Sequence, residues 1–331
     1  MFKKIKSIFI VSMIVLFIFQ GFLLSGYATD TKINYPERAV TVICPWAAGG
    51  GTDALARFLA DQLQKRFGQP FVVINKTGGD GAVGHTAGAL ARPDGYTMTL
   101  ATIEISNMHW MGLTDVSVDN FEYVIHLNQD PASVCVQIDS PWNSVSDLLD
   151  AIKNNPGKYM FSASSTGGIW DLSRIGLLYT AGIPVDDVIW VPTTGAAPSL
   201  TELLGGHVDV YTGSLPEAQA QIEAKLIKPI AIMADQRDPN YPDVPTLKEQ
   251  GINWSSGTWR GFLVPRGTPK EIISILYEAC NDIAQTNEFK DFMKLRGFGI
   301  RILNSEEFEK FAREQDQTWK TILELGGYIK E

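Results

Sequence analysis

The 331-residue chain is 45% hydrophobic and 20% charged, as is ordinary for a globular protein. Its formal net charge of −9 argues against nucleic acid or an anionic lipid surface as a partner. The chain is also longer than one hydrophobic core usually serves, so the length predicts two domains.

The N-terminal segment has the pattern of an export signal. Three lysines lie within the first six residues, residues 8–24 are almost continuously apolar, and small residues precede a cut after Ala28. The pattern predicts that residues 1–28 are a cleaved signal peptide and that the protein is exported, periplasmic or extracytoplasmic. The alternative is an uncleaved anchor, since the apolar run is only slightly short of the roughly 20 residues that span a membrane.

The first part of the mature chain alternates short β-branched runs with longer amphipathic stretches. Strands are expected at residues 40–44, 71–75 and 96–101, and helices at residues 52–67 and 81–91. This β-α-β-α-β order is typical of a parallel sheet covered by helices, and the nearly continuous apolar strands agree with burial on both faces.

A second run of the same kind follows an apolar stretch at residues 134–136. Ser144 is expected to begin the first of its helices. Helices are expected at residues 145–154, 169–181, 197–204 and 215–224, and strands at residues 159–163, 188–191, 208–211 and 229–234.

The last third returns to the character of the first part. It predicts a strand at residues 261–264 and helices at residues 269–285 and 305–325, the last capped by Ser305. The fold class expected is therefore α/β, with two doubly wound α/β domains joined by a hinge and a ligand cleft between them.

The three cysteines, Cys44, Cys135 and Cys280, lie in apolar strand-like or helical runs. Buried free thiols are expected, because an odd number of cysteines in such runs does not suggest a disulfide framework. The sequence has no CxxC motif and no Cys/His cluster, so no metal and no cofactor is expected.

The most informative motif is the PWAAGGGTD run at residues 45–53, directly between a strand and a helix. Its glycines allow a ligand to approach the backbone closely, and Thr52 or Asp53 can cap the helix that follows. The free N–H groups and the dipole of that helix attract anions, so the run predicts one wall of a carboxylate site. A glycine-rich turn without a ligand is the alternative, and neither nucleotide-binding glycine motif is present.

Three further strand-to-helix junctions, at residues 77–81, 162–168 and 192–196, are rich in glycine and small hydroxyl residues. Ligands of open α/β sheets bind outside the carboxyl ends of the strands, where these junctions would lie. Together the four loops predict an anion-binding cleft.

Catalytic motifs are absent from the sequence. There is no G-x-S-x-G or H-E-x-x-H pattern, and the four histidines are scattered. Trp46, Trp110, Trp170 and Trp259 each stand beside a glycine-rich or polar segment and could pack in a core or line a cleft. Asp171 could face water, cap its helix or bind a ligand hydroxyl.

The order of several motifs identifies a family resemblance. These motifs include Tyr35-Pro36, FGQPFVV at 67–73, PDGYT at 93–97, NPGKY at 155–159, GAAP at 195–198, LLGGHVD at 203–209, PDVPT at 242–246 and PRGTPK at 265–270. From about residue 33 to its end the chain resembles the receptors of tripartite tricarboxylate transporters, also called the Bug family.

The resemblance implies a type II periplasmic binding protein fold. Residues 33–135 and 258–331 would form domain 1, and residues 136–257 would form domain 2. Family members hold carboxylates through main-chain N–H groups and ordered water rather than an arginine clamp, and a bridging water can nearly equal a direct hydrogen bond. The ligand-binding residues expected on this basis are Trp46, Ala47, Ala48, Gly49, Gly50, Thr52, Thr102, Ser164, Ser165, Thr166, Gly167, Gly168, Trp170, Asp171, Thr193, Thr194, Gly195 and Ala196.

Three residues depart from the family pattern. Glu104 stands where members carry small residues, and it is expected to point away from the cleft because it would repel an anion. Trp170 could narrow the cavity or stack on a planar ligand, and Asp171 could favour a hydroxyl, an amide or a cation.

The function expected is that of a monomeric extracytoplasmic receptor, not an enzyme. It would capture a small carboxylate in the interdomain cleft and deliver it to the large and small integral membrane subunits of a transporter. A ligand-sensing subunit for a membrane kinase is an alternative that the sequence does not separate. An exported hydrolase using a serine within residues 162–166 is less favoured, because no base can be placed beside those serines.

Overall fold

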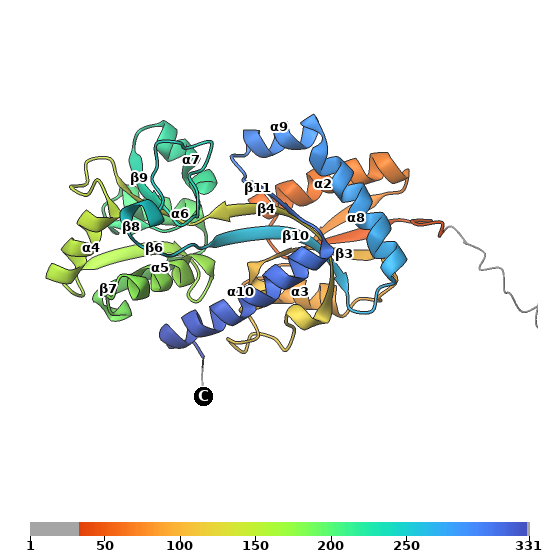
Figure 1. Cartoon of the computed structure of the whole chain (residues 1–331), viewed down its shortest axis with the longest axis horizontal. Coiled ribbons are helices and arrows are strands. Elements are labelled where there is room, and N and C mark those ends of the chain that lie inside the picture. Colours follow the sequence, from red (N-terminus) through yellow and green to blue (C-terminus); the bar gives the residue numbers. More distant parts are fainter. Residues whose placement is uncertain (1–32, 330–331) are drawn as a thin grey trace, which may run out of the picture. The chain divides into compact units, whose positions relative to one another are not determined.

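A computed structural model describes residues 33–329 of the chain. The predicted signal peptide and the alternative membrane anchor lie outside the described residues. Of the helices within this range, none is both long enough and apolar enough to cross a membrane. The residues from Tyr35 onward form one compact unit that contains two β-sheets, both visible in Figure 1.

The first sheet has the strand order β11-β4-β10-β3-β1-β2. β1 pairs in parallel with β2 and β3, as the β-α-β-α-β order predicts. β10 pairs antiparallel with both β3 and β4, so the sheet is mixed rather than purely parallel. Its strands are β1 (Val40–Cys44), β2 (Phe71–Asn75), β3 (Thr97–Thr102), β4 (Phe121–Pro131), β10 (Gly257–Pro265) and β11 (Ile300–Leu303).

Helices whose apolar faces are buried cover this sheet. Leu55, Leu59 and Leu63 recur at helical spacing along α2 and are fully buried, and Gly68 ends the helix in a left-handed conformation, with φ 69°. Asn304 caps α10, one residue before the expected Ser305. The helices are α2 (Gly51–Phe67), α3 (Ala82–Ala89), α8 (Lys270–Gln285), α9 (Asn287–Leu295) and α10 (Ser305–Leu325).

The second sheet has the strand order β7-β6-β8-β5-β9. β6 is parallel to β7 and β8, whereas β5 is antiparallel to β8 and β9. Ser144 caps α4 as predicted. Strands and helices are β5 (Ser133–Gln137), α4 (Val145–Asn154), β6 (Tyr159–Ser164), α5 (Ile169–Thr180), β7 (Val188–Thr193), α6 (Ala196–Leu204), β8 (Val210–Tyr211), α7 (Leu215–Glu223) and β9 (Ile227–Ile232).

The chain passes between the two sheets at two adjacent places. One follows the end of β4 and the other precedes the start of β10, and these two long strands lie side by side in Figure 1. Ala132 joins β4 to β5, and Ser256 immediately precedes β10. The Ala132 N–H donates to the Ser256 carbonyl (N···O 2.9 Å), and the Ser256 N–H donates to the Met233 carbonyl at the same distance. The two crossings are therefore tied together by main-chain hydrogen bonds.

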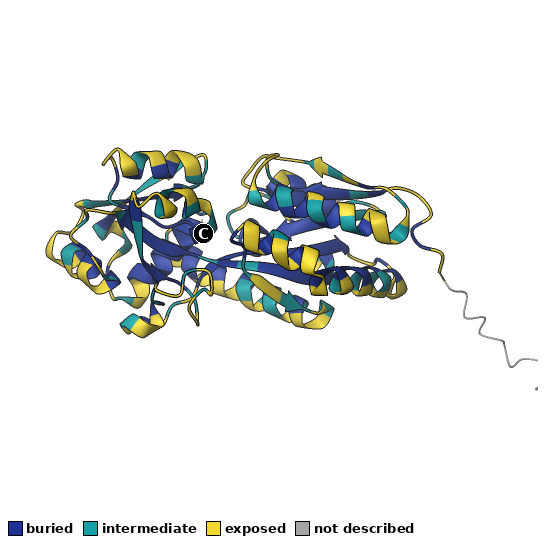
Figure 2. Ribbon diagram, turned by 90° about the horizontal axis from the view of Figure 1, so that it is seen from above, coloured by how far each residue is buried: buried dark blue, intermediate teal, exposed yellow. Residues whose placement is uncertain are grey.

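The buried faces of the strands and helices form two apolar clusters, and Figure 2 shows this burial along both sheets. The three cysteines are buried and free, which confirms the expectation of unpaired thiols. Burial raises the pKa of Cys135 to about 12, so its sulfur stays protonated and unreactive.

Candidate functional site

Three helices begin at the same cavity, and each has a glycine at its N-cap. Gly50 precedes α2, Gly168 precedes α5 and Gly195 precedes α6. A glycine has no side-chain oxygen, so the first-turn N–H groups of these helices receive no side-chain cap. Uncapped N–H groups at the positive ends of helix dipoles form a strong anion-binding arrangement.

The cavity has a volume of about 580 Å³ and is lined by connections from both sheets. Of the residues expected to bind ligand, the structure brings together in its lining Trp46, Ala47, Gly50, Thr52, Thr102, Ser164, Ser165, Gly168, Trp170, Thr193, Thr194, Gly195 and Ala196. Two further lining residues, Gly51 and Asp80, lie in loops that the sequence predicts to form the cleft, and the lining residues not expected are Glu104, Ile169, Glu217, Thr258 and Arg260.

Five expected residues are not in that lining, namely Ala48, Gly49, Thr166, Gly167 and Asp171. The Gly49 N–H donates to Asp53 (N···Oδ2 2.8 Å), so this amide is used within the loop. Burial alone would raise the pKa of Asp53, but hydrogen bonds from Arg57, Gly49 and Asn75 outweigh it and lower that pKa. The Asp53 carboxylate is thus ionised, and its hydrogen bond with Gly49 stabilises the conformation of the first glycine loop.

Asp171, in the first turn of α5, stabilises the loop before that helix in the same way. Its carboxylate is fully buried and accepts hydrogen bonds from the Gly167 N–H (3.0 Å), Arg174 Nη2 (2.7 Å) and Tyr328 Oη (2.5 Å). These three partners turn it away from the cavity. Of the roles expected for Asp171, its burial excludes facing water, and its bond to the Gly167 N–H just before α5 is close to the expected role of a helix cap.

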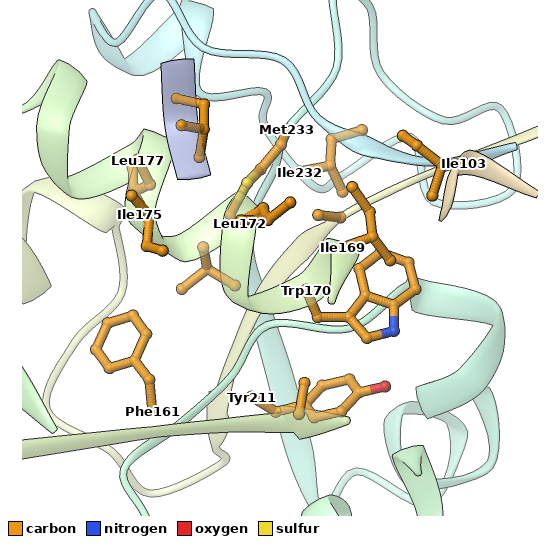
Figure 3. Packing of buried hydrophobic residues seen from close by; sticks show 14 of the residues in the cluster. Ile103, Phe161, Ile169, Trp170, Leu172, Ile175, Leu177, Tyr211, Ile232 and Met233 are labelled. Atoms are coloured by element: carbon orange, nitrogen blue, oxygen red, sulfur yellow. The ribbon is translucent and has the colours of Figure 1, made fainter. Parts of the chain in front are cut away.

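The tryptophans divide between the cavity and the core. Trp46 and Trp170 line the cavity, whereas Trp259 is fully buried and Trp110 packs on the outside of an apolar cluster. Trp170 is also 95% buried, and Figure 3 shows its indole beside Ile169 among the buried apolar residues. Trp170 is therefore both part of the core and part of the cavity wall.

A buried polar chain runs from the first glycine loop to Glu104. Trp46 Nε1 donates to Thr102 Oγ1 (3.0 Å), and Thr102 Oγ1 donates to Glu104 Oε2. The Thr102 N–H donates to His85 Nε2 (3.2 Å), so the proton of this imidazole lies on Nδ1, which donates to the Gly81 carbonyl.

The expectation that Glu104 points away from the cleft is wrong. Its side chain is only 6% exposed and lines the cavity. The short helical turn Ile103–Ser106 after β3 directs it inward, and the hydrogen bond from Thr102 holds it there. Burial raises the pKa of Glu104 to about 7, so this carboxyl can stand near the anion site without a full charge.

Arg260 is a second residue that the sequence did not indicate. It lies on β10, and its guanidinium lines the cavity. The guanidinium donates to Thr52 Oγ1 (3.0 Å), Asn128 Oδ1 and Asp130 Oδ2 (2.6 Å). The buried Asp130 carboxylate therefore already balances the charge of this arginine.

Glu217 and Asp80 bring two more carboxylates to the wall. Glu217 accepts hydrogen bonds from the Ser214 N–H and from Tyr211 Oη, both at 3.2 Å. Its side chain is exposed to solvent within the cavity, but desolvation by the surrounding protein atoms raises its pKa. Asp80 accepts from Ser165 Oγ (2.8 Å), and this hydrogen bond joins loops attached to the two sheets. Within residues 33–329, no group of His, Cys, Asp and Glu side chains could hold a metal ion.

Comparison with known proteins places this geometry in a family. Residues 55–327 match the tripartite tricarboxylate transporter family receptor. The chain is similar to the protein BugT of Bordetella pertussis, with 26% identity over 97% of this chain and 98% of that protein.

Two solved structures are also similar. A TctC solute-binding protein from Polaromonas, without ligand, is 33% identical and superimposes with a TM-score of 0.77, covering 88% of this chain and 99% of that one. MatC from Rhodopseudomonas palustris, with bound malate, is 26% identical with a TM-score of 0.74, covering 87% of this chain and all of that one. These matches confirm the resemblance and the two-domain α/β fold class that the motifs predict. The chain belongs to the tripartite tricarboxylate transporter family receptors, the family of the Bug solute-binding proteins.

Proposed function

We propose that this receptor captures a small carboxylate in the cavity and delivers it to the membrane subunits of a tripartite tricarboxylate-type transporter. The observation that carries the proposal is the convergence of three glycine-capped helix N-termini on one cavity. Each N-terminus offers main-chain donors and about half a unit of positive charge. The malate bound by the related MatC supports the same ligand class.

Capture would rest on contacts with both sheets. A ligand held by Gly50 from the first sheet and by Gly168 and Gly195 from the second favours the arrangement in which all three lie close together. The domain division expected from the resemblance, residues 33–135 and 258–331 against residues 136–257, suits this mechanism, except that β5 begins at Ser133 and belongs to the second sheet. The hydrogen-bonded crossings at Ala132 and Ser256 lie where such domains would meet.

A receptor of this family acts outside the cytoplasm and catalyses no reaction, so the proposal also concerns export and the alternative of a hydrolase. We propose that the protein is exported and that residues 1–28 are removed after Ala28. A hydrolase gains no support from the cavity, because no histidine is among its described lining residues and Ser165 Oγ donates to Asp80 instead. Capture followed by transfer to a transporter requires neither a nucleophile nor a cofactor.

A ligand screen of the mature protein tests the proposal. The protein would be unfolded and refolded to remove bound ligand, and then melted with mono-, di- and tricarboxylates, aromatic acids, amino acids, and uncharged sugars as controls. A ligand that binds only the folded state at a hundred times its Kd adds about 2.7 kcal/mol to the free energy of unfolding, which a melting curve detects. Stabilisation by one class of carboxylate is expected, and stabilisation by sugars alone would contradict the proposal.

A further inference from the structure

The charges on the cavity wall are unusual for a site that takes an anion. Among the described residues of the lining, Asp80, Glu104, Glu217 and Arg260 have ionisable side chains. Three of these four are acids. The one cation, Arg260, is already paired with the buried carboxylate of Asp130 at 2.6 Å.

The three helix N-termini together supply roughly one and a half positive charges, at about half a charge each. That suffices for one ligand carboxylate. A second carboxylate would share the same cavity with the three acids of its wall, and like charges repel. A plain dicarboxylate therefore matches only part of this cavity.

Of the three acids in the described lining, Glu104 is the buried one. Thr102, itself held by Trp46 and His85, orients it. Asp80 is exposed and bonded to Ser165, and Glu217 takes part in the cap of α7.

We propose that the ligand is an amino-carboxylate, with its carboxylate on the helix N-termini and its protonated amine beside the acids of the wall, and that Glu104 determines this specificity. The inference rests on the proposed function and narrows it to one ligand class. An ammonium group offers three donors and a positive charge. A hydroxyl on the same carbon skeleton offers one donor and no charge.

Two matched series test the inference by calorimetric titration of the refolded, ligand-free protein at about pH 8, where Glu104 is mainly ionised. The first series is succinate, malate and aspartate, and the second is propionate, lactate and alanine. The amine-bearing member of at least one series is expected to bind at least about tenfold more tightly than its unsubstituted analogue, a difference of about 1.4 kcal/mol.

The variant Glu104→Gln keeps the size of the side chain and removes its charge. It is expected to reduce that preference to about twofold or less, whereas Glu278→Gln, at an exposed position on α8, leaves it unchanged. Circular dichroism and melting curves of both variants confirm that they are folded. An unchanged preference in folded Glu104→Gln would overturn the assignment of Glu104.

The remaining outcomes separate this inference from the proposed function. Unsubstituted acids that bind as tightly as the amine-bearing acids in both series would overturn the inference and leave the carboxylate receptor intact. Hydroxy acids that match the amine-bearing acids in both series would overturn the role of the positive charge. Failure of every carboxylate, in these series and in the screen, would overturn the proposed function and the inference with it.

Discussion

Gly50 contributes to the site because it has no side chain. It occupies the N-cap of α2 with extended backbone angles, φ −77° and ψ 172°, that any residue can adopt. A Cβ there would meet no atom closer than 3.5 Å. The glycine is thus not required by the fold, and its absence of a side chain leaves the helix terminus open to a ligand.

Replacing Gly50 by Asp should abolish binding without harming the fold. Aspartate is a favourable N-cap, so its carboxylate would satisfy the N–H groups that the ligand would use. The melting temperature without ligand is expected to be unchanged or slightly higher, and affinity is expected to fall at least about a hundredfold, or ~2.7 kcal/mol. Titration and melting of the same sample measure both effects.

Gly205→Asp is the matched control, since Gly205 also has a negative φ and a Cβ there would make ordinary contacts at 3.4 Å, but it lies at the C-terminal end of α6. Wild-type affinity in this control is expected. Wild-type affinity in Gly50→Asp would remove the first glycine loop from the site.

Glu104 should make stability depend on pH. Its carboxyl has a pKa of about 7 when folded, against 4.5 for the free group, so the folded state retains a proton that the unfolded state has lost. The contribution of this group to stability is therefore greatest below about pH 4.5 and is lost as pH rises towards 7, by about 3 kcal/mol in all. Above pH 7, Glu104→Gln is expected to be more stable than wild type by that order.

Buried His85 opposes this trend, because burial lowers its pKa to about 4 and stability from this group rises with pH between about 4 and 6.5. Chemical unfolding at several pH values should therefore be read as the difference between wild type and Glu104→Gln. A constant difference across pH 4 to about 8 would show that Glu104 titrates normally.

At the scale of the elements, α5 is fastened to the C-terminal end of the chain. Asp171 in its first turn binds Arg174 on the same helix and Tyr328 beyond α10, and all of Asp171 and nearly all of Arg174 are buried. Neither charge can return to water while the protein is folded. Asp171 therefore links the loop before α5 to the segment that follows α10.

Asp171→Ala is expected to destabilise the protein by about 3–5 kcal/mol, because it leaves the charge of the buried Arg174 guanidinium without a carboxylate partner. Denaturant unfolding measures the change. Asp150→Ala, at an exposed position on α4, provides the comparison and should change stability by less than about 0.5 kcal/mol. A loss of affinity in Asp171→Ala with no loss of stability would instead indicate direct contact with the ligand.

The sequence could predict elements and loops where the governing interactions are local. Glycine-rich turns at strand ends depend on neighbouring residues, so the loops around Gly50, Gly168 and Gly195 were found. The inward position of Arg260 depends on β10 pairing with β3 and β4, which no local pattern records. β4 was not expected either, because it buries polar residues such as Asn128 and Asp130 that Arg260 satisfies.

At the scale of the whole molecule, ligand binding should protect loops attached to both sheets from amide hydrogen exchange. Amide hydrogen exchange is expected to slow on adding ligand in the loops at residues 45–50, 164–168 and 193–196. Residues 287–295 of α9, which contribute nothing to the cavity lining, provide the internal reference. Protection confined to the loops of one sheet would contradict capture between two domains.

The uncapped helices also bear on how this protein should be handled. The first-turn N–H groups of the three helices have no side-chain acceptor, and any small anion can accept their hydrogen bonds. Acetate, sulfate, phosphate or citrate from a purification buffer would then act as a competitor, and an apparent affinity would vary with the counter-ion of the solution. For this receptor the composition of the buffer is part of the binding equilibrium.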